Sequence, residues 1–180
     1  MNKNDQRSAV STRATMHPDE WQARVQLAAC YRIFDMLGWT EMIYNHITVR
    51  VPTSVSGDER QFLINPFGLH YSEVTAANLV KIDSRGRILD GSPYPVNPAG
   101  FTVHAAIHAG IQDAHCVMHT HTTAGVAVAC LKGGLQQTNF YSAQLHNRVI
   151  AGGILIAAAG CARDTLESGA GQNEIATRSQ

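Results

Sequence analysis

A short apolar segment between two helical patterns limits the folds open to this chain most strongly. Residues 115–119, HCVMH, are apolar enough to form a strand buried on both faces. The segment GFTVHAAIHAGI at 100–111 precedes them and TTAGVAVACL at 122–131 follows, both with helical character. A strand enclosed in this way needs helices on the faces of a sheet, so we expect a layered α/β or α+β domain.

The residues upstream predict an N-terminal helix and an antiparallel hairpin. Pro18 with two acidic residues after it favours a helix start, and apolar residues recur at three- and four-residue steps up to Gly38. Residues 47–51 alternate in polarity, 52–57 are turn residues, and QFLIN at 61–65 completes two strands. Strands and helices are thus mixed without βαβ alternation, which disfavours a doubly wound nucleotide-binding fold.

Shorter elements complete the predicted order. A short helix is expected from Ser72 to Leu79, followed by a strand at 80–83. FYSAQLHNRV at 140–149 is interpreted as a helix that contains His146. The chain shows no internal repeats, so these elements are expected to form one domain.

The composition predicts a soluble cytoplasmic domain. The 180 residues carry no net charge and 44% are hydrophobic, so the chain can bury one core and attracts neither nucleic acid nor an anionic membrane. The longest apolar stretch, 150–160, is about half of the ~20 residues that a spanning helix needs. The four cysteines have no C-x-x-C pairing and are expected to be reduced: Cys30, Cys116, Cys130 and Cys161.

Two histidines at the end of the predicted buried strand suggest a metal site. In an extended strand His119 and His121 point to the same side, so both imidazoles can face one ion. A catalytic zinc site usually takes three protein ligands, and this pair supplies two. The alternative is that the two rings cap the strand end through hydrogen bonds.

The other histidines are assigned to packing or to the surface. His104 and His108 stand four residues apart on the predicted helix, but small apolar neighbours favour packing over metal binding. His104 could still hold the second nitrogen of a metal-ligating imidazole. His46, His70 and His115 show no partner in the sequence pattern.

Several motifs resemble the class II aldolase/adducin family. The run NPAGFTVHAAIHAGIQDAHCVMHTHTTAGVAV at 97–128 is similar to the core of that family, and so are YNHITVRVP at 44–52 and FLINPFGLHYSEVTAANLVKID at 62–83. These motifs keep the family's order over roughly residues 20–148. The resemblance implies a three-layer α/β/α sandwich with a central, mostly antiparallel sheet. It also implies a homo-oligomer, often a tetramer with active sites between subunits.

The resemblance further implies a metal centre and a type of reaction. A divalent metal, most often zinc, would be held by His119 and His121 together with one distant histidine. The metal would act as a Lewis acid on a small hydroxy-carbonyl substrate, which is cleaved or isomerised through an enediolate. Residues that match the family's substrate loops are Asn45, Thr48, Asn65 and Gly68. Taken singly, each of them also fits a hairpin end or a turn.

Residues 98–100 depart from the aldolase pattern. Sugar-phosphate aldolases of the family carry an acid/base glutamate where this chain has Gly100, and phosphate-binding serines where it has Pro98 and Ala99. No catalytic acid or base is therefore identified, and a phosphorylated substrate is disfavoured. The sequence PAGF at 98–101 resembles the adducin-like branch of the family. An aldehyde-lyase is favoured, and the alternatives are a non-haem iron oxygenase or decarboxylase on the same scaffold and a non-catalytic adducin-like interaction domain.

The last part of the chain departs from the family pattern. After Arg148 the motifs stop, and the family's distant histidine has no counterpart before Gln180. Three segments are therefore expected: a flexible arm at 1–16, the aldolase/adducin-like domain at 17–148, and a divergent tail at 149–180. A change of reading frame or truncation would explain the tail, and so would an unusual natural sequence.

Overall fold

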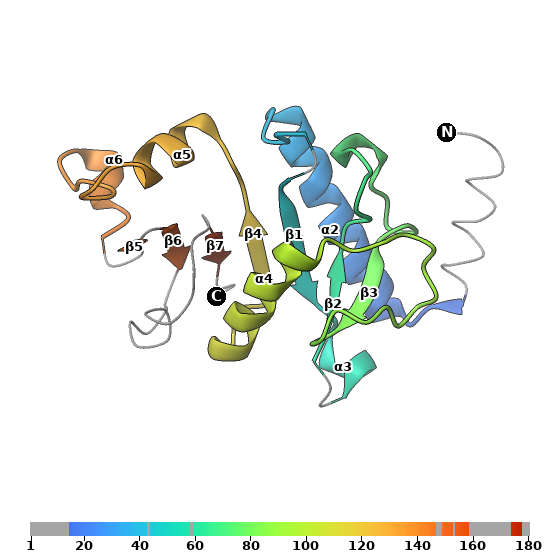
Figure 1. The fold of residues 1–180 in the computed structure, drawn as a ribbon. Coiled ribbons are helices and arrows are strands. Elements are labelled where there is room, and N and C mark those ends of the chain that lie inside the picture. Colours follow the sequence, from blue (N-terminus) through green and yellow to red (C-terminus); the bar gives the residue numbers. More distant parts are fainter. Residues whose placement is uncertain are drawn as a thin grey trace.

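The protein has a mixed α/β fold built around one sheet (Figure 1). The computed structural model describes residues 15–42, 44–57, 60–146, 149–152, 154–158 and 174–177. The helices are α2 (Pro18–Met36), α3 (Thr53–Ser56), α4 (Pro98–Gly110), α5 (Thr123–Ala129) and α6 (Phe140–Ala143), with a 3-10 turn at Tyr71–Glu73. The strands are β1 (His46–Arg50), β2 (Gln61–Ile64), β3 (Val80–Asp83), β4 (Cys116–His119), β5 (Val149–Gly152), β6 (Ile154–Ala158) and β7 (Glu174–Thr177).

The sheet is mostly antiparallel, as the sequence predicts. The strand order within the described part of the chain is β3-β2-β1-β4-β7-β6-β5. Neighbouring strands run antiparallel except for β6 and β7, which are parallel. The predicted buried strand, β4, lies between β1 and β7. Its central place explains the apolar character of CVMH.

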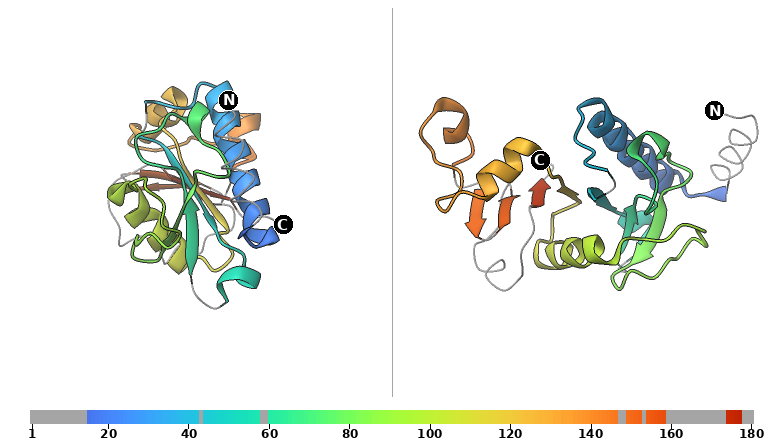
Figure 2. Two further views of the ribbon diagram at one scale, coloured as in Figure 1. Left: turned by 90° about the vertical axis from the view of Figure 1, so that its right-hand side faces the viewer. Right: turned by 45° about the horizontal axis from the view of Figure 1, so that its top comes forward.

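Helices cover both faces of the sheet, so the predicted three-layer arrangement is confirmed. The left view of Figure 2 shows α2 on one side of the strands and α4 on the other. The alternation along β2 explains why both faces need cover: Leu63 packs in the cluster with α2, whereas Phe62 and Ile64 pack with Phe101 of α4.

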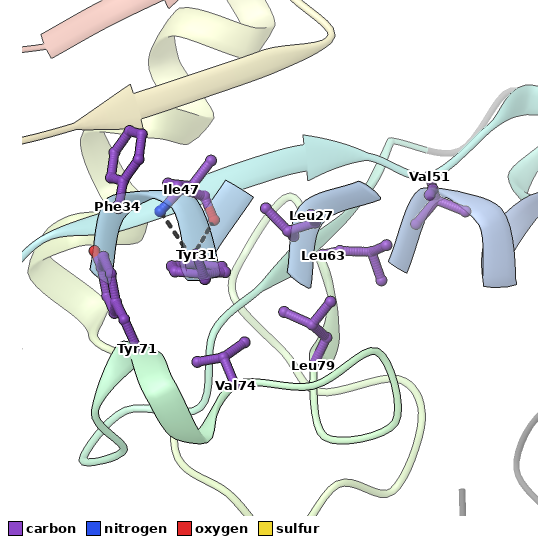
Figure 3. Close-up of a cluster of buried hydrophobic side chains, with 10 residues drawn as sticks. Leu27, Tyr31, Phe34, Ile47, Val51, Leu63, Tyr71, Val74 and Leu79 are labelled. Atoms are coloured by element: carbon purple, nitrogen blue, oxygen red, sulfur yellow. Dashed lines mark hydrogen bonds between the residues drawn. The ribbon is translucent and has the colours of Figure 1, made fainter. Parts of the chain in front are cut away.

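The larger core cluster lies between α2 and the sheet (Figure 3). Leu27, Tyr31 and Phe34 recur on one face of α2 at the helical spacing seen in the sequence. The hydroxyl of Tyr31 accepts a hydrogen bond from Ile47 N at 2.8 Å and lies 2.7 Å from Ile47 O. This buried phenol therefore joins the helix to the start of β1, which is the end of the sheet that carries the histidines.

Two predicted helices are wrong in length. The helix does not continue to Leu79: the 3-10 turn ends at Glu73 and residues 76–78 form a separate turn, because side chains there compete for the backbone. Thr75 N donates to Asn78 Oδ1 at 2.7 Å, and Asn78 Nδ2 donates to Glu73 O at 2.9 Å. The predicted helix at 140–149 is only one turn, α6, and β5 begins at Val149.

Other predictions concern the termini, the cysteines and membranes. Residues 1–14 of the predicted arm lie outside the described residues, as do 153, 159–173 and 178–180 of the tail. Cys30, Cys116 and Cys130 are free thiols, and Cys161 lies outside the described residues. Among the residues that the structure describes, none of the helices is long and apolar enough to cross a membrane.

Candidate metal centre

The register of the central strands brings distant residues to one end of the sheet. β1 runs antiparallel to both β2 and β4, so β1 begins at the end of the sheet where β2 and β4 finish. His46 at the start of β1 pairs directly with His119 at the end of β4. Asn45 precedes that pair and Asn65 follows β2, so polar side chains from three segments gather at this end of the sheet.

His119 and His121 face one another. Their Nε2 atoms are in direct contact, and the ring centroids lie 4.5 Å apart at an interplanar angle of 74°. His119 is buried at the end of β4, whereas the side chain of His121 is 34% exposed in the connection to α5. Two converging imidazole nitrogens are a donor pair that suits zinc or iron, and a hydrogen bond between the rings is the alternative interpretation. The pair therefore fits a divalent metal by the nature and direction of its donors.

A third protein ligand is not found in the described part of the chain. Among those residues, no set of three or more histidine, cysteine, aspartate or glutamate side chains is arranged to hold one ion. Among the described residues, the protein ligands available to a metal are therefore the two histidines that the H-x-H spacing predicts. The identity of that pair as a metal site stays a prediction.

A carboxylate that the sequence pattern did not single out lies beside the two histidines. Glu41, in the connection between α2 and β1, places its Oε2 atom 2.7 Å from Nδ1 of His121. Glu41 lies in a turn, where hydrophobic periodicity gives no indication of its role, and it is 80 residues away from His121 in the sequence. Only the pairing of β1 with β4 brings the two segments together.

His46 also lies near His119 and His121, and the sequence pattern missed this residue too. Its ring stacks on His119, with centroids 4.9 Å apart and planes at 24°, and lies 4.2 Å from the ring of His104. Burial lowers the pKa of His46 to about 4, although hydrogen bonding to the backbone of Tyr44 and Gly100 opposes the shift. The ring is therefore neutral at physiological pH.

Gly100 is the residue on which His46 packs. A Cβ atom built on Gly100 would lie 2.5 Å from Cε1 and 2.6 Å from Nε2 of His46. These distances are far shorter than a van der Waals contact, so the imidazole occupies the space that any side chain at position 100 would enter. Glycine at position 100 thus leaves room for the imidazole of His46 from β1.

Thr48 joins the two buried histidines of α4. His108 Nδ1 lies 2.7 Å from Ala114 O, which can only accept, so this nitrogen carries the proton. Burial lowers the pKa of His108 to about 4, so the ring is neutral and its Nε2 accepts from the Thr48 hydroxyl at 2.9 Å. The hydroxyl oxygen then accepts from His104 Nδ1 at 2.7 Å. Burial lowers the pKa of His104 too, consistent with a neutral ring.

This arrangement bears on the predictions for Thr48 and His104. The Thr48 hydroxyl is buried and engaged with two rings, so a contact with substrate would require one of these bonds to open. His104 packs as predicted, and it supports His46 by ring contact. The sequence interpretation of His46 as a residue without partners is corrected by its stacking on His104 and His119.

α4 is held against β1 at its far end by arginine side chains. Arg50 donates to the carbonyl oxygens of His108 and Gln112, and to Ile111 O at 2.9 Å. Arg60 donates to Ala109 O at 3.2 Å. Cations at a helix C-terminus favour its exposed carbonyl groups, so these contacts fix the position of α4 and of its histidines.

The remaining predicted substrate residues lie at the same end of the sheet. Asn45 is buried and its Nδ2 donates to Trp39 O at 2.6 Å. Asn65 is also buried, with its Oδ1 atom 2.9 Å from the hydroxyl of Tyr31. Gly68 lies in the exposed turn after β2 with a φ of 101°, a conformation that favours glycine. Asn45 thus holds the backbone at Trp39 and Asn65 binds the Tyr31 hydroxyl, and contact of either with a substrate stays a prediction.

Comparison with known proteins gives a consistent family assignment. The family model described as "Class II Aldolase and Adducin N-terminal domain" matches residues 25–175. A "Putative aldolase class 2 protein" of Caulobacter vibrioides is 50% identical over 126 residues, which cover 70% of this chain and 48% of that protein. Alpha-adducin of Rattus norvegicus is 52% identical over 114 residues, 62% of this chain and 15% of that one.

Solved structures show the same fold. An aldolase II superfamily protein from Pseudomonas syringae superposes with a TM-score of 0.72 at 40% identity, covering 84% of this chain and 57% of that chain. An L-fuculose 1-phosphate aldolase from Glaciozyma antarctica PI12 superposes with a TM-score of 0.67 at 26% identity, covering 88% and 61%. The chain spans about half the length of the bacterial relative, 48%. The family match continues past Arg148 to residue 175, and the segment boundaries stay a prediction.

Proposed function

The chain belongs to the class II aldolase and adducin N-terminal domain family, and from this premise we propose that it contributes to a metal-dependent lyase that cleaves or isomerises a small hydroxy-carbonyl compound. The observation that carries the proposal is the convergence of the Nε2 atoms of His119 and His121 at the end of β4. These two residues would hold the metal, most often zinc in such a donor set, with iron as the alternative.

The metal and the protein would contribute different parts of the chemistry. A divalent ion at this position supplies Lewis-acid polarisation of a substrate oxygen. His119 is held in place by burial and by stacking on His46, so its Nε2 is directed toward His121. Asn45, Asn65 and the turn at Gly68 lie around the same end of the sheet and would bind polar groups of the substrate.

The residues near Gly100 favour a substrate without a phosphate group. The sequence has Pro98 and Ala99 where the family's sugar-phosphate aldolases have phosphate-binding serines. The imidazole of His46 fills the space above Gly100, so a side-chain carboxylate has no room there. We therefore expect weak or no turnover of sugar phosphates, and a mechanism that differs from theirs in its proton transfer.

Metal content tests the proposal directly. Purified protein should contain weakly bound, substoichiometric zinc or iron, because two protein ligands leave much of the coordination shell to water. Elemental analysis after loading and desalting should show this metal lost in His119→Ala/His121→Ala and retained in His70→Ala. His70 is a matched control, since it is an exposed histidine outside the central strands. Equal metal content in all three proteins would refute the site.

Two observations favour a second candidate function, a non-catalytic interaction domain like that of the adducins. The sequence lacks the glutamate of the sugar-phosphate aldolases, and alpha-adducin is 52% identical over the matched residues. Retro-aldol assays on unphosphorylated hydroxy-carbonyl compounds, with and without a chelator, separate the two. Turnover that a chelator abolishes supports the lyase, and metal-free protein without turnover supports the interaction domain.

A further inference from the structure

We propose that Glu41 is a positioning residue, which fixes the tautomer of His121 and so directs the lone pair of its Nε2 atom toward a divalent metal ion. The inference rests on the proposed function for the role of the metal. Its structural part concerns one hydrogen bond and can be tested in metal-free protein. Neither the H-x-H spacing nor the family motifs in this sequence point to Glu41.

The contact itself determines where the proton of His121 lies. Glu41 Oε2 is 2.7 Å from His121 Nδ1, a short distance that is typical of a charge-assisted hydrogen bond. A carboxylate can only accept, so Nδ1 must carry the hydrogen. In a neutral imidazole the other nitrogen is then bare. Nε2 is the atom of His121 that meets Nε2 of His119, so the bare nitrogen is the one directed at the site.

Glu41 is placed to bind the histidine that would hold the metal, and not to bind the metal itself. Its carboxylate is on the Nδ1 side of the ring, whereas a metal shared with His119 would lie on the Nε2 side. The two nitrogens of an imidazole point in diverging directions, so one carboxylate oxygen cannot serve both. Within the described residues, Glu41 also forms no three-residue ligand group with the histidines.

A hydrogen bond and a ring contact restrain the turn that presents Glu41. Asn45 Nδ2 donates to Trp39 O at 2.6 Å, and the Trp39 ring packs edge-on against Phe34 at 5.4 Å. Met42, directly after Glu41, adopts a φ of 53°, which costs a residue other than glycine about 1 kcal/mol or more. The surrounding contacts must offset this cost, so the turn holds Glu41 in a defined place.

The two histidines differ in how much they need such a partner. His119 is buried at a strand end and stacks on His46, so packing restrains its ring. His121 lies in the connection between β4 and α5, with its side chain 34% exposed. Packing restrains this second ring less, and the hydrogen bond from Nδ1 supplies the orientation that metal binding requires.

Nitrogen NMR of the metal-free protein tests the hydrogen bond directly. With 15N-labelled histidine at a pH where the rings are neutral, the wild type should show His121 with its proton on Nδ1. Glu41→Ala should shift it toward the Nε2–H form, while Glu41→Gln should keep it, because an amide oxygen also accepts. Asp35→Ala is the matched control, since Asp35 lies 3.7 Å from His70 on the surface. An unchanged His121 tautomer in Glu41→Ala would overturn the proposal.

Zinc affinity, measured by competition with a chelator, tests the consequence. We expect Glu41→Ala to bind zinc about 10- to 100-fold more weakly than wild type, with Glu41→Gln in between and Asp35→Ala unchanged. In a His121→Ala background, Glu41→Ala should have no further effect. Equal losses in both backgrounds, or no loss in either, would refute the positioning role.

The two measurements separate this inference from the proposed function. If zinc binding is the same in wild type and in His119→Ala/His121→Ala, the proposed metal centre fails, and the metal-directing part of the role of Glu41 fails with it. The tautomer measurement then still decides whether Glu41 orients His121. The thermal unfolding of Glu41→Ala should match wild type, because this side chain is 51% exposed and buries little.

Discussion

Replacing Gly100 by alanine should destabilise the protein through the ring of His46. The new Cβ atom would lie 2.5 Å from Cε1, 2.6 Å from Nε2 and 2.8 Å from Nδ1 of that ring, so a shift of about 1 Å is needed to restore normal contacts. The ring cannot move away freely, because His104 and His119 lie against it at 4.2 and 4.9 Å. We therefore treat the change as overpacking of a filled site.

The expected magnitude follows from two opposing effects. Overpacking of a well-packed core typically costs about 1–3 kcal/mol. Alanine in place of glycine inside a helix returns up to about 1 kcal/mol, and less at the third residue of α4. The packing effect is the larger, so the free energy of unfolding should fall by about 1–2 kcal/mol, measured by urea denaturation.

A double-mutant cycle with His46→Ala isolates the cause. Without the imidazole the Cβ atom at position 100 meets no ring, so Gly100→Ala should be neutral or slightly stabilising in that background. The expected coupling between the two changes is about 1–3 kcal/mol. If Gly100→Ala costs the same with and without His46, or costs nothing in wild type, then the steric explanation for the glycine is incorrect.

Two further predictions concern the buried histidines. Thr48→Val should lower the free energy of unfolding by about 2–4 kcal/mol in urea titrations, because it removes the hydroxyl that joins two buried rings. Thr102→Val, at an exposed hydroxyl, is the control and should cost less than about 1 kcal/mol. Equal costs for the two changes would contradict the role of Thr48. Burial lowers the pKa of His46 and His108 from 6.5 to about 4, so the unfolded chain binds protons that the folded chain does not. Stability should be level above about pH 7 and fall between about pH 6.5 and 4, by several kcal/mol in total, and a constant unfolding midpoint over that range would refute it.

Hydrophobic periodicity predicts well those helices and strands whose own apolar residues decide which face is buried. α2 follows its three- and four-residue apolar spacing from Pro18 to the turn at Gly38, and β4 coincides with the apolar run CVMH. The helix expected up to Leu79 fails for a different reason. Thr75 and Asn78 bind each other's backbone there, and this local alternative to a helix is not visible in hydrophobic periodicity.

Prediction of the site was limited by long-range pairing. The H-x-H spacing is local, so a strand end with two same-side imidazoles could be inferred from the sequence. The roles of His46 and Glu41 depend on β1 lying antiparallel beside β4, with His46 opposite His119. Register of this kind is set by the packing of the whole sheet, and no short window of sequence contains it.

Gly100 and His46 are best understood as one packing unit. In the sequence, glycine stands where the resemblance to sugar-phosphate aldolases would place an acid/base glutamate. In the fold, a glycine is what allows an imidazole from β1 to approach the backbone of α4 and to stack on His119. Gly100→Glu would therefore displace His46 and disturb His119, the proposed metal ligand, before any carboxylate could act. In this fold the absence of a side chain at Gly100 and the position of the His46 ring depend on each other, so the chemistry proposed for the site has to be tested with His46 in place.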